Sequence, residues 1–480
     1  MTLHMHNKYM KTEHAHYSIN IPQELQNFIE QDTYSLLIKG DVGTGKTTLA
    51  LSILLALQIK KNCLYLSTRT SPERLFKHFT WLENFFDQSK KLDLVDASEL
   101  ATDIATFVDS RLDEPASLYE RITNELMDVK SPIIVIDSWN AISASMDQES
   151  LVSNAKVLQT WRERAGAKVI FVLEGSDDTS LDFLVDGIVE LKKEYKENRT
   201  LREIFFHKLH GVQIKRPTYF FSLYNSVFNS YDPSLLSNFD KIFSKSIDIK
   251  KISPPIHDNH VNTGYDQLDL VLGGGIPLRS IILIELDSHV DVRVSLLILS
   301  NLISNFVSAG NFAIIHSFEG LKKDFVEKFL DKIIISQTKS DLTSIIYPEE
   351  SHIDNNVSGT DSNPLTTYRD KLVEITQNKK NKQILSILGS NILDYFRGDQ
   401  TKLRSFLNFN KHNSNLTFFI NRSTNKEMSQ ILSEFAEIYF KITEISGNLF
   451  LQGKIPWSHL FAIVIKTHNG KSKLVFEPVV

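Results

Sequence analysis

The sequence is poor in cysteine and has no long apolar run. Its single cysteine, Cys63, cannot form a disulfide within the chain, which excludes a disulfide framework and suits a reducing compartment. No apolar run reaches the roughly 18 residues that a membrane-spanning helix needs. The N-terminal segment MTLHMHNKYMKTEHAHYSI is polar and lacks the apolar core of a secretory signal. We therefore expect a cytoplasmic protein that does not cross a membrane.

The chain also lacks an excess of positive charge. It has 480 residues, with 53 basic and 58 acidic side chains and a formal net charge of -5. This balance does not support binding to nucleic acid through bulk charge. The stretch FFHKLHGVQIKRPTYFF mixes basic and aromatic residues, which single-stranded nucleic acid would accept. Alternating strand positions explain the same aromatics, so DNA remains a partner that the charge does not support.

Apolar strands alternate with helical segments in the first half. The segment 71–86 is expected to form one helix, with Ser71 as N-cap and Pro72 in its first turn. Strands that are apolar on both faces indicate a mainly parallel sheet covered by helices on both sides, which is an α/β fold. Strands are expected at 34–38, 62–67, 131–138 and 167–176.

The second half repeats this order of signals. Apolar strands recur in NFAIIHSFEG, KQILSILGS and NLTFFINRS, after a turn-strand-loop-helix stretch that resembles the start of the first half. The chain therefore reads as two copies of one α/β unit. We expect a flexible tail at 1–17, a first domain at 18–230, a linker at 231–257 and a second domain at 258–480.

A glycine-rich loop follows the first strand. The stretch GDVGTGKT matches the phosphate-loop pattern without a mismatch and lies between a strand and a helix. Its glycines let successive N–H groups turn inward as an anion nest, and the helix N-terminus adds positive potential. Lys46 is expected to reach the β- and γ-phosphates of ATP. The residues expected to contact the nucleotide are Gly40, Asp41, Val42, Gly43, Thr44, Gly45, Lys46, Thr47 and Thr48.

A carboxylate ends the buried strand at 131–138. Thr47 offers a hydroxyl to Mg²⁺, and Asp137 can hold the same ion through water. Asp is also a favoured helix N-cap, which is the alternative explanation for Asp137. The phosphate loop favours the metal, so we expect Thr47 and Asp137 to bind Mg²⁺.

The stretch TGYDQLDLVLGGGIP in the second half resembles the start of RecA-like ATPase domains of the KaiC and RadA type. The resemblance implies two tandem RecA-like P-loop domains and a ring-shaped homo-oligomer. In that family the second strand ends in glutamates that activate water, whereas Thr68 and Arg69 stand there in this chain. Glu174, after a later strand, is the remaining candidate for a catalytic carboxylate.

The end of the first half also resembles these ATPases. Their K-x-R-G motif carries a lysine and an arginine that reach a neighbouring subunit's nucleotide. Lys208 matches the lysine, and His210 replaces the arginine, so the charge becomes titratable and the guanidinium fork is lost. We treat both as catalytic candidates, with an exposed strand end as the alternative.

The stretches IPQELQNFIEQDTYSLLIKGDVGTGKTTLAL and YLSTRTSP resemble a narrower family, the gas-vesicle regulator D group. This resemblance covers most of the first half. It implies an ATP-binding regulator that acts through a protein partner.

The second half has lost the chemistry of the loop. Its equivalent stretch, ELDSHVDVRVSLL, has no glycine and no lysine, and three carboxylates there would repel a triphosphate. Arg293 can offset one of them, and Gly389 replaces the metal carboxylate of the first half. Glu319 remains where a water-activating group would stand. The three carboxylates of the stretch ELDSHVDVRVSLL are Glu285, Asp287 and Asp291. We expect a degenerate domain kept for packing or partner binding.

Three functions remain open from the sequence. The first is a nucleotide-dependent switch that binds Mg-ATP, hydrolyses it slowly or not at all, and acts on a protein partner. The second is an active ATPase whose water-activating residue is Glu174 or comes from a neighbouring subunit. The third is a recombination accessory protein that binds DNA.

Overall fold

The computed structural model describes two compact units, 1–231 with residue 480, and 232–479. Within them it describes residues 19–58, 62–85, 105–109, 131–144, 163, 166–176, 179, 181–233, 246–316, 320–334, 339–346, 364–378, 382–396, 398–468 and 470–480. The tail expected at 1–17 lies outside these residues. No helix in the described part is long and apolar enough to cross a membrane.

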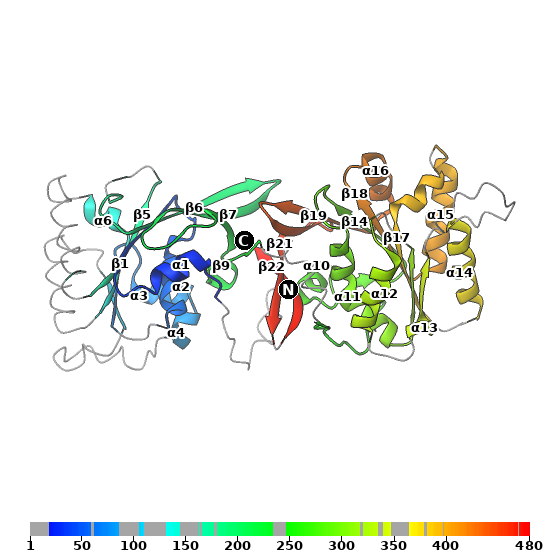
Figure 1. Ribbon diagram of the computed structural model, residues 1–480, viewed down its shortest axis with the longest axis horizontal. Helices are drawn as coiled ribbons and strands as arrows, with labels where there is room; N and C mark the ends of the chain where they lie inside the picture. Colours follow the sequence, from blue (N-terminus) through cyan, green and yellow to red (C-terminus); the bar gives the residue numbers. More distant parts are fainter. Residues whose placement is uncertain are drawn as a thin grey trace, which may run out of the picture. The chain divides into compact units, whose positions relative to one another are not determined.

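The first unit is built on a nine-stranded sheet with the order β3-β2-β4-β5-β1-β6-β7-β8-β9. Figure 1 shows this unit in blue to green, with β1, β5, β6, β7 and β9 labelled. Within this order, each strand from β3 across to β6 is parallel to its neighbour, and each strand from β6 to β9 is antiparallel to its neighbour. The described elements are α1 (Gln23–Ile29), β1 (Tyr34–Gly40), α2 (Lys46–Ala56), β2 (Cys63–Ser67), α3 (Pro72–His78), α4 (Trp81–Phe85), β3 (Ala105–Asp109), β4 (Ile133–Asp137), α6 (Trp139–Ser143), β5 (Lys168–Glu174), β6 (Gly187–Lys196), β7 (Arg199–Leu209), β8 (Thr218–Ser222), a 3-10 turn (Tyr224–Ser226) and β9 (Asn229–Ser230).

Both faces of this sheet are buried, as the apolar strands predicted. On β1, Leu36 and Ile38 pack into one core cluster with side chains of α2. Leu37 points to the other face and packs in a second cluster with Trp139 and Ile142 of α6. Successive strand residues alternate between faces, so an apolar run such as YSLLI can supply both cores. The expected α/β fold with mainly parallel strands is confirmed.

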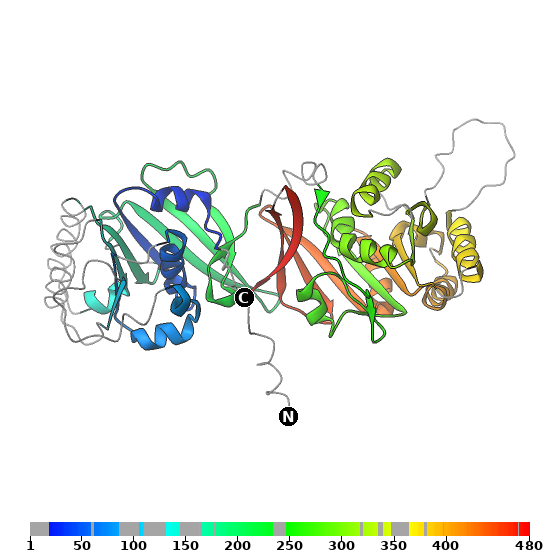
Figure 2. The ribbon, with the colours of Figure 1, turned by 90° about the horizontal axis from the view of Figure 1, so that it is seen from below.

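The second unit has a ten-stranded sheet in the order β10-β22-β21-β20-β19-β14-β18-β17-β15-β16. Figure 2 shows it from below, in green to red. Its described elements, with a small sheet of β11 to β13, are β10 (Ser246–Ile247), β11 (Ile256–His257), β12 (His260–Val261), α10 (Asp266–Val271), β13 (Ile276–Pro277), β14 (Ser280–Leu286), α11 (Arg293–Ser308), β15 (Phe312–His316), α12 (Lys323–Ile333), α13 (Lys339–Leu342), β16 (Thr343–Ile346), α14 (Pro364–Asn378), β17 (Ile384–Gly389), a 3-10 segment (Ser390–Phe396), α15 (Gln400–Asn413), β18 (Leu416–Arg422), α16 (Lys426–Phe435), β19 (Ile438–Ile445), β20 (Asn448–Ile455), β21 (Leu460–His468) and β22 (Lys471–Val479).

The two sheets have the same connectivity. The order β16-β15-β17-β18-β14-β19-β20-β21 repeats the order β3-β2-β4-β5-β1-β6-β7-β8 strand for strand, in chain order and in space. The parallel part and the antiparallel part also change at the same place, after β6 and after β19. The repeated unit inferred from the sequence is therefore present in the fold, and residues of the two units can be matched by strand register.

Two sequence expectations need correction. The expected linker at 231–257 includes β10, which pairs with β22, and β11, which pairs with β12, so part of it belongs to the sheets of the second unit. Pairing satisfies backbone groups that a free linker would leave to water. The single helix expected at 71–86 is two helices, because Phe79 leaves the helical region at φ -112° and ψ 74°. This break lets Trp81 become fully buried.

Candidate functional site

The phosphate loop joins the end of β1 to the start of α2. Gly43 and Gly45 have φ of 76° and 107°, values that favour glycine. Gly40, with φ of 148°, lies against β6: a Cβ placed there would be 2.4 Å from the backbone oxygen of Leu191. A Cβ on Gly45 would be 2.6 Å from Leu223. The glycines therefore serve both the backbone conformation of the loop and its close packing.

The Lys46 side chain folds back over this loop. Its Nζ donates hydrogen bonds to the carbonyl oxygens of Gly40 and Asp41, both at 2.7 Å. Burial lowers the pKa of Lys46 from its usual value, and the nearby carboxylates of Glu174 and Asp137 act in the opposite direction. The ammonium is thus held at the loop, in the place from which a P-loop lysine contacts phosphate oxygens.

Thr47 and Asp137 come together at the ends of α2 and β4. The Thr47 hydroxyl donates to Asp137 Oδ2 at 2.7 Å, and the Tyr65 hydroxyl donates to the same oxygen at 2.6 Å. Burial raises the pKa of Asp137 above its usual value, against the effect of these two hydrogen bonds. A hydroxyl and a carboxylate are hard oxygen ligands, which suit Mg²⁺: Thr47 would hold the ion directly and Asp137 would hold it through water. Tyr65 was not anticipated from the sequence.

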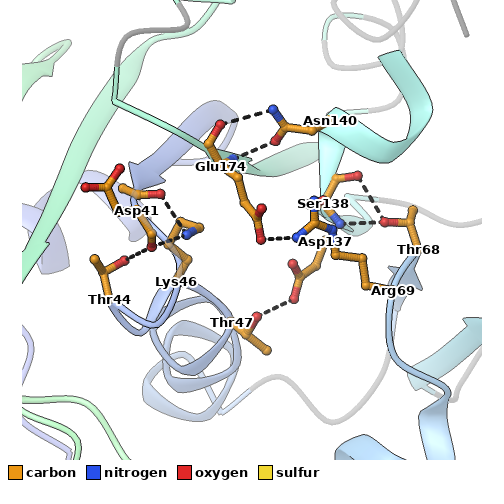
Figure 3. Close-up of polar contacts among 11 residues, drawn as sticks. Asp41, Thr44, Lys46, Thr47, Thr68, Arg69, Asp137, Ser138, Asn140 and Glu174 are labelled. Carbon is orange, nitrogen blue, oxygen red and sulfur yellow. Dashed lines mark hydrogen bonds and ion pairs between the residues drawn. The ribbon is translucent and has the colours of Figure 1, made fainter. Parts of the chain in front are cut away.

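The strand ends beside the loop carry a second pair of charges. Arg69 follows β2, Glu174 ends β5, and the Arg69 guanidinium forms a short ion pair with Glu174. Figure 3 shows the Arg69 and Glu174 side chains pointing toward one another, with Asp137 directed at Thr47 and Lys46 directed at the loop. The backbone of Glu174 is fixed by Asn140, whose Oδ1 accepts from its N–H at 2.6 Å. The carboxylate that we considered for catalysis is therefore engaged by an arginine.

Arg202 on β7 supports the loop from the side, and sequence reasoning missed it. Its guanidinium donates to the carbonyl oxygens of Gly43 at 2.8 Å and Thr44 at 3.2 Å. The side chain is 9% exposed although it carries a charge. Its place in the basic stretch KKEYKENRTLR was the only signal, and that stretch reads equally well as a solvated hairpin. The contacts show that Arg202 positions the loop carbonyls.

Lys208 and His210 lie elsewhere in the unit. Lys208 pairs with Ile188 near the start of β6 and donates to the Val185 carbonyl at 2.6 Å. His210 is 64% exposed and lies 3.7 Å from Asp186. The phosphate loop begins at Gly40, which pairs with Leu191 further along β6, and in the described contacts neither residue touches the loop of its own unit. Their contact with a neighbouring subunit's nucleotide stays a prediction.

The strand register identifies the equivalent positions in the second unit. Gly40 ends β1 and Leu286 ends the matching strand β14. Gly40 pairs with Glu174 and Leu286 pairs with Arg422, so Arg422 takes the position of Glu174 in the second unit. By the same register Gly389 takes the position of Asp137, as expected from the sequence. Next to the loop, the first unit pairs Lys39 of β1 with Glu190 of β6. The second unit pairs Glu285 of β14 with Lys441 of β19, so the signs of the two charges are exchanged.

Internal contacts fill the loop of the second unit. The Arg422 guanidinium donates to the carbonyl oxygens of Asp287, Ser288 and Val290, at 3.4, 3.3 and 2.5 Å. Arg293 is bound to Asp291 at 2.6 Å, which lowers the pKa of that carboxyl. The described part of this loop therefore offers its carbonyls to an arginine and not its N–H groups to an anion. Glu319, the other residue of interest here, lies outside the described residues.

Lys441 modifies the repulsion expected in this loop. Its Nζ lies 3.6 Å from a Glu285 oxygen and 3.5 Å from an Asp287 oxygen. Each carboxylate that we expected to repel a triphosphate thus has a basic neighbour. The second loop therefore differs from the first mainly because it lacks the anion nest of backbone N–H groups, and less because its carboxylates would repel a triphosphate.

A strand, a glycine loop and a helix with Lys46, Thr47 and Asp137 in these positions define a P-loop domain, the class whose loop binds nucleotide phosphates. The family model of the GvpD gas vesicle protein, P-loop domain, matches residues 25–207. This match confirms the resemblance inferred from the sequence: residues 25–207 of the first unit are similar to the P-loop domain of the GvpD group.

Two proteins of Halobacterium salinarum are similar to this chain. Protein GvpD2 is 24% identical over 298 residues, which are 60% of this chain and 59% of the relative. Protein GvpD1 is 29% identical over 277 residues, which are 55% of this chain and 50% of the relative. The matched region thus spans between half and three fifths of each relative's length.

Proposed function

We propose that this chain is an ATP-binding regulatory protein. Mg-ATP at the loop of the first unit acts as a switch on a protein partner and is hydrolysed slowly or not at all. One observation carries the proposal: Lys46, Thr47 and Asp137 lie together at the loop, whereas Thr68 and Arg69 stand where related ATPases carry their water-activating glutamates. Hydrolysis needs a carboxylate available to position or deprotonate water.

The proposal includes a tandem RecA-like architecture. The shared strand order of the two sheets and the stretch TGYDQLDLVLGGGIP support it. In this proposal 18–230 is the ATP-binding domain and 258–480 is a degenerate domain used for packing or partner binding. The Arg422 contacts with the second loop support the absence of a second nucleotide.

The switch would act through the terminal phosphate. In P-loop switches, γ-phosphate contacts order the surrounding loops, and loss of that phosphate releases them. The resemblance to the GvpD-like group supports a partner that is a protein.

Binding and turnover must be measured separately to test this function. We expect calorimetry with Mg-ATP to find one site per chain, and Lys46→Ala to remove it. Lys77→Ala is the matched control, because Lys77 is an exposed lysine on α3. Wild-type protein without any nucleotide binding would refute the proposal.

Phosphate release distinguishes the switch from an active ATPase. We expect slow turnover, or none, that does not depend on Glu174. A clear rate that is lost in Glu174→Gln would instead identify an ATPase with Glu174 as its water-activating group. ATP-dependent, salt-sensitive binding to single-stranded DNA would support the DNA accessory function.

A further inference from the structure

Arg69 stands where the related ATPases carry a carboxylate, and it lies at the nucleotide side of the sheet. It leaves β2 at the carboxyl end, beside the end of β4 that carries Asp137. Its guanidinium is paired with Glu174, and Glu174 lies opposite Gly40, where the phosphate loop begins. A P-loop lysine contacts the β- and γ-phosphates. A guanidinium in the same group of charges is therefore close to the terminal phosphate of a bound triphosphate.

The backbone before Arg69 is fixed. The Thr68 N–H donates to the Asp137 carbonyl at 2.7 Å. The Thr68 hydroxyl donates to the Ser138 carbonyl at 3.0 Å and accepts from the Ser138 N–H at 2.7 Å. These three bonds tie the end of β2 to the end of β4. The position from which the Arg69 side chain extends is thus held relative to Asp137 and the proposed magnesium site.

The partner of Arg69 in this structure is a weak competitor for a phosphate. The Arg69 side chain is 48% exposed and that of Glu174 is 25% exposed, so water screens their ion pair. A terminal phosphate offers more negative charge and an oxygen geometry that matches the guanidinium fork. Glu174 keeps its backbone bonds to Asn140 whether or not its carboxylate is engaged. The guanidinium can therefore change partners without breaking the strand.

We propose that Arg69 binds the terminal phosphate and selects nucleoside triphosphate over diphosphate, and that Glu174 holds the guanidinium when that phosphate is absent. This inference rests on the proposed function, because it needs a nucleotide at Lys46. It assigns Glu174 to positioning Arg69 and not to activating water. The exchange of Glu174 for phosphate is the local event by which the protein distinguishes ATP from ADP.

The test compares the affinities of full-length protein for Mg-ADP and for the Mg²⁺ complex of β,γ-imido-ATP, by calorimetry. For Arg69→Ala we expect the affinity for the triphosphate analogue to fall about tenfold or more, the loss of a charge-assisted hydrogen bond. The affinity for ADP should change by less than about twofold, because only longer-range charge is lost. Arg69→Lys should fall between wild type and Arg69→Ala, because it keeps the charge without the fork.

Glu174→Gln should have the opposite effect on the same measurements. Without the competing carboxylate, we expect the triphosphate analogue to bind about threefold or more tighter, with ADP less affected. The matched control is Arg74→Ala, which removes an exposed arginine of α3 and should change neither affinity. Circular dichroism and the melting temperature verify that each variant is folded.

The outcomes separate this inference from the proposed function. Equal losses for both nucleotides in Arg69→Ala, or an affinity ratio like that of Arg74→Ala, would overturn the role of Arg69 while leaving nucleotide binding intact. Weaker triphosphate binding in Glu174→Gln would overturn the role of Glu174. If neither nucleotide binds wild-type protein, the proposed function fails, and this inference fails with it.

Discussion

Gly40→Ala is the sharpest test of how the phosphate loop is packed. Gly40 adopts φ of 148°, a conformation that costs other residues about 1–3 kcal/mol. The new Cβ would lie 2.4 Å from the Leu191 backbone oxygen and 2.8 Å from the Thr44 hydroxyl. The Leu191 oxygen belongs to the backbone of β6, which pairs in parallel with β1, so it cannot move aside alone. Overpacking of this kind costs about another 1–3 kcal/mol.

The two contributions add to about 2–6 kcal/mol of unfolding free energy for Gly40→Ala. This is a large part of the 5–15 kcal/mol or so that stabilises a typical domain. Gly43→Ala is the matched control. Gly43 has φ of 76°, but a Cβ there would meet nothing within 4 Å, so only a backbone cost of about 1–2 kcal/mol applies.

Urea unfolding followed by tryptophan fluorescence measures this difference. Trp81 and Trp139 of the first unit are buried, whereas Trp457 of the second is 55% exposed, so the signal of the described tryptophans follows mainly the first unit. We expect the midpoint of Gly40→Ala to fall well below that of Gly43→Ala, with a similar slope. Equal midpoints for the two variants would refute the close packing of the loop on β6.

Two further predictions concern charged groups in the two loops. Because burial raises the folded-state pKa of Asp137, its contribution to stability is greatest below the unfolded pKa and is lost as pH rises through the folded pKa. Asp137→Asn should therefore raise the urea midpoint at pH 7 in nucleotide-free protein, yet weaken magnesium-dependent nucleotide binding about tenfold or more; a lower midpoint would contradict the first part. Arg422→Met should destabilise the second unit by about 1–3 kcal/mol, because three loop carbonyls lose a charged donor. Nucleotide stoichiometry should remain one per chain, and a second bound nucleotide would contradict the degenerate loop.

The sequence by itself determined the features that consecutive residues encode. GDVGTGKT specifies the loop because each glycine acts on its own backbone and the next helix follows directly. The apolar strands predicted a sheet buried on both faces, and their recurrence predicted the repeated unit. The sequence wrongly predicted one continuous helix through Phe79, because burial of Trp81 outweighs the local preference for that helix.

Only the tertiary structure decided which distant side chains meet. Arg69 and Glu174 are 105 positions apart, and strand order alone brings them together. Arg202 reaches the first loop from β7, and Arg422 fills the second from β18, and neither contact has a local signal. In a parallel sheet the carboxyl ends of strands from distant parts of the chain lie at one edge, so their register decides which charges become neighbours. A single sequence carries no marker of that register beyond the loop itself.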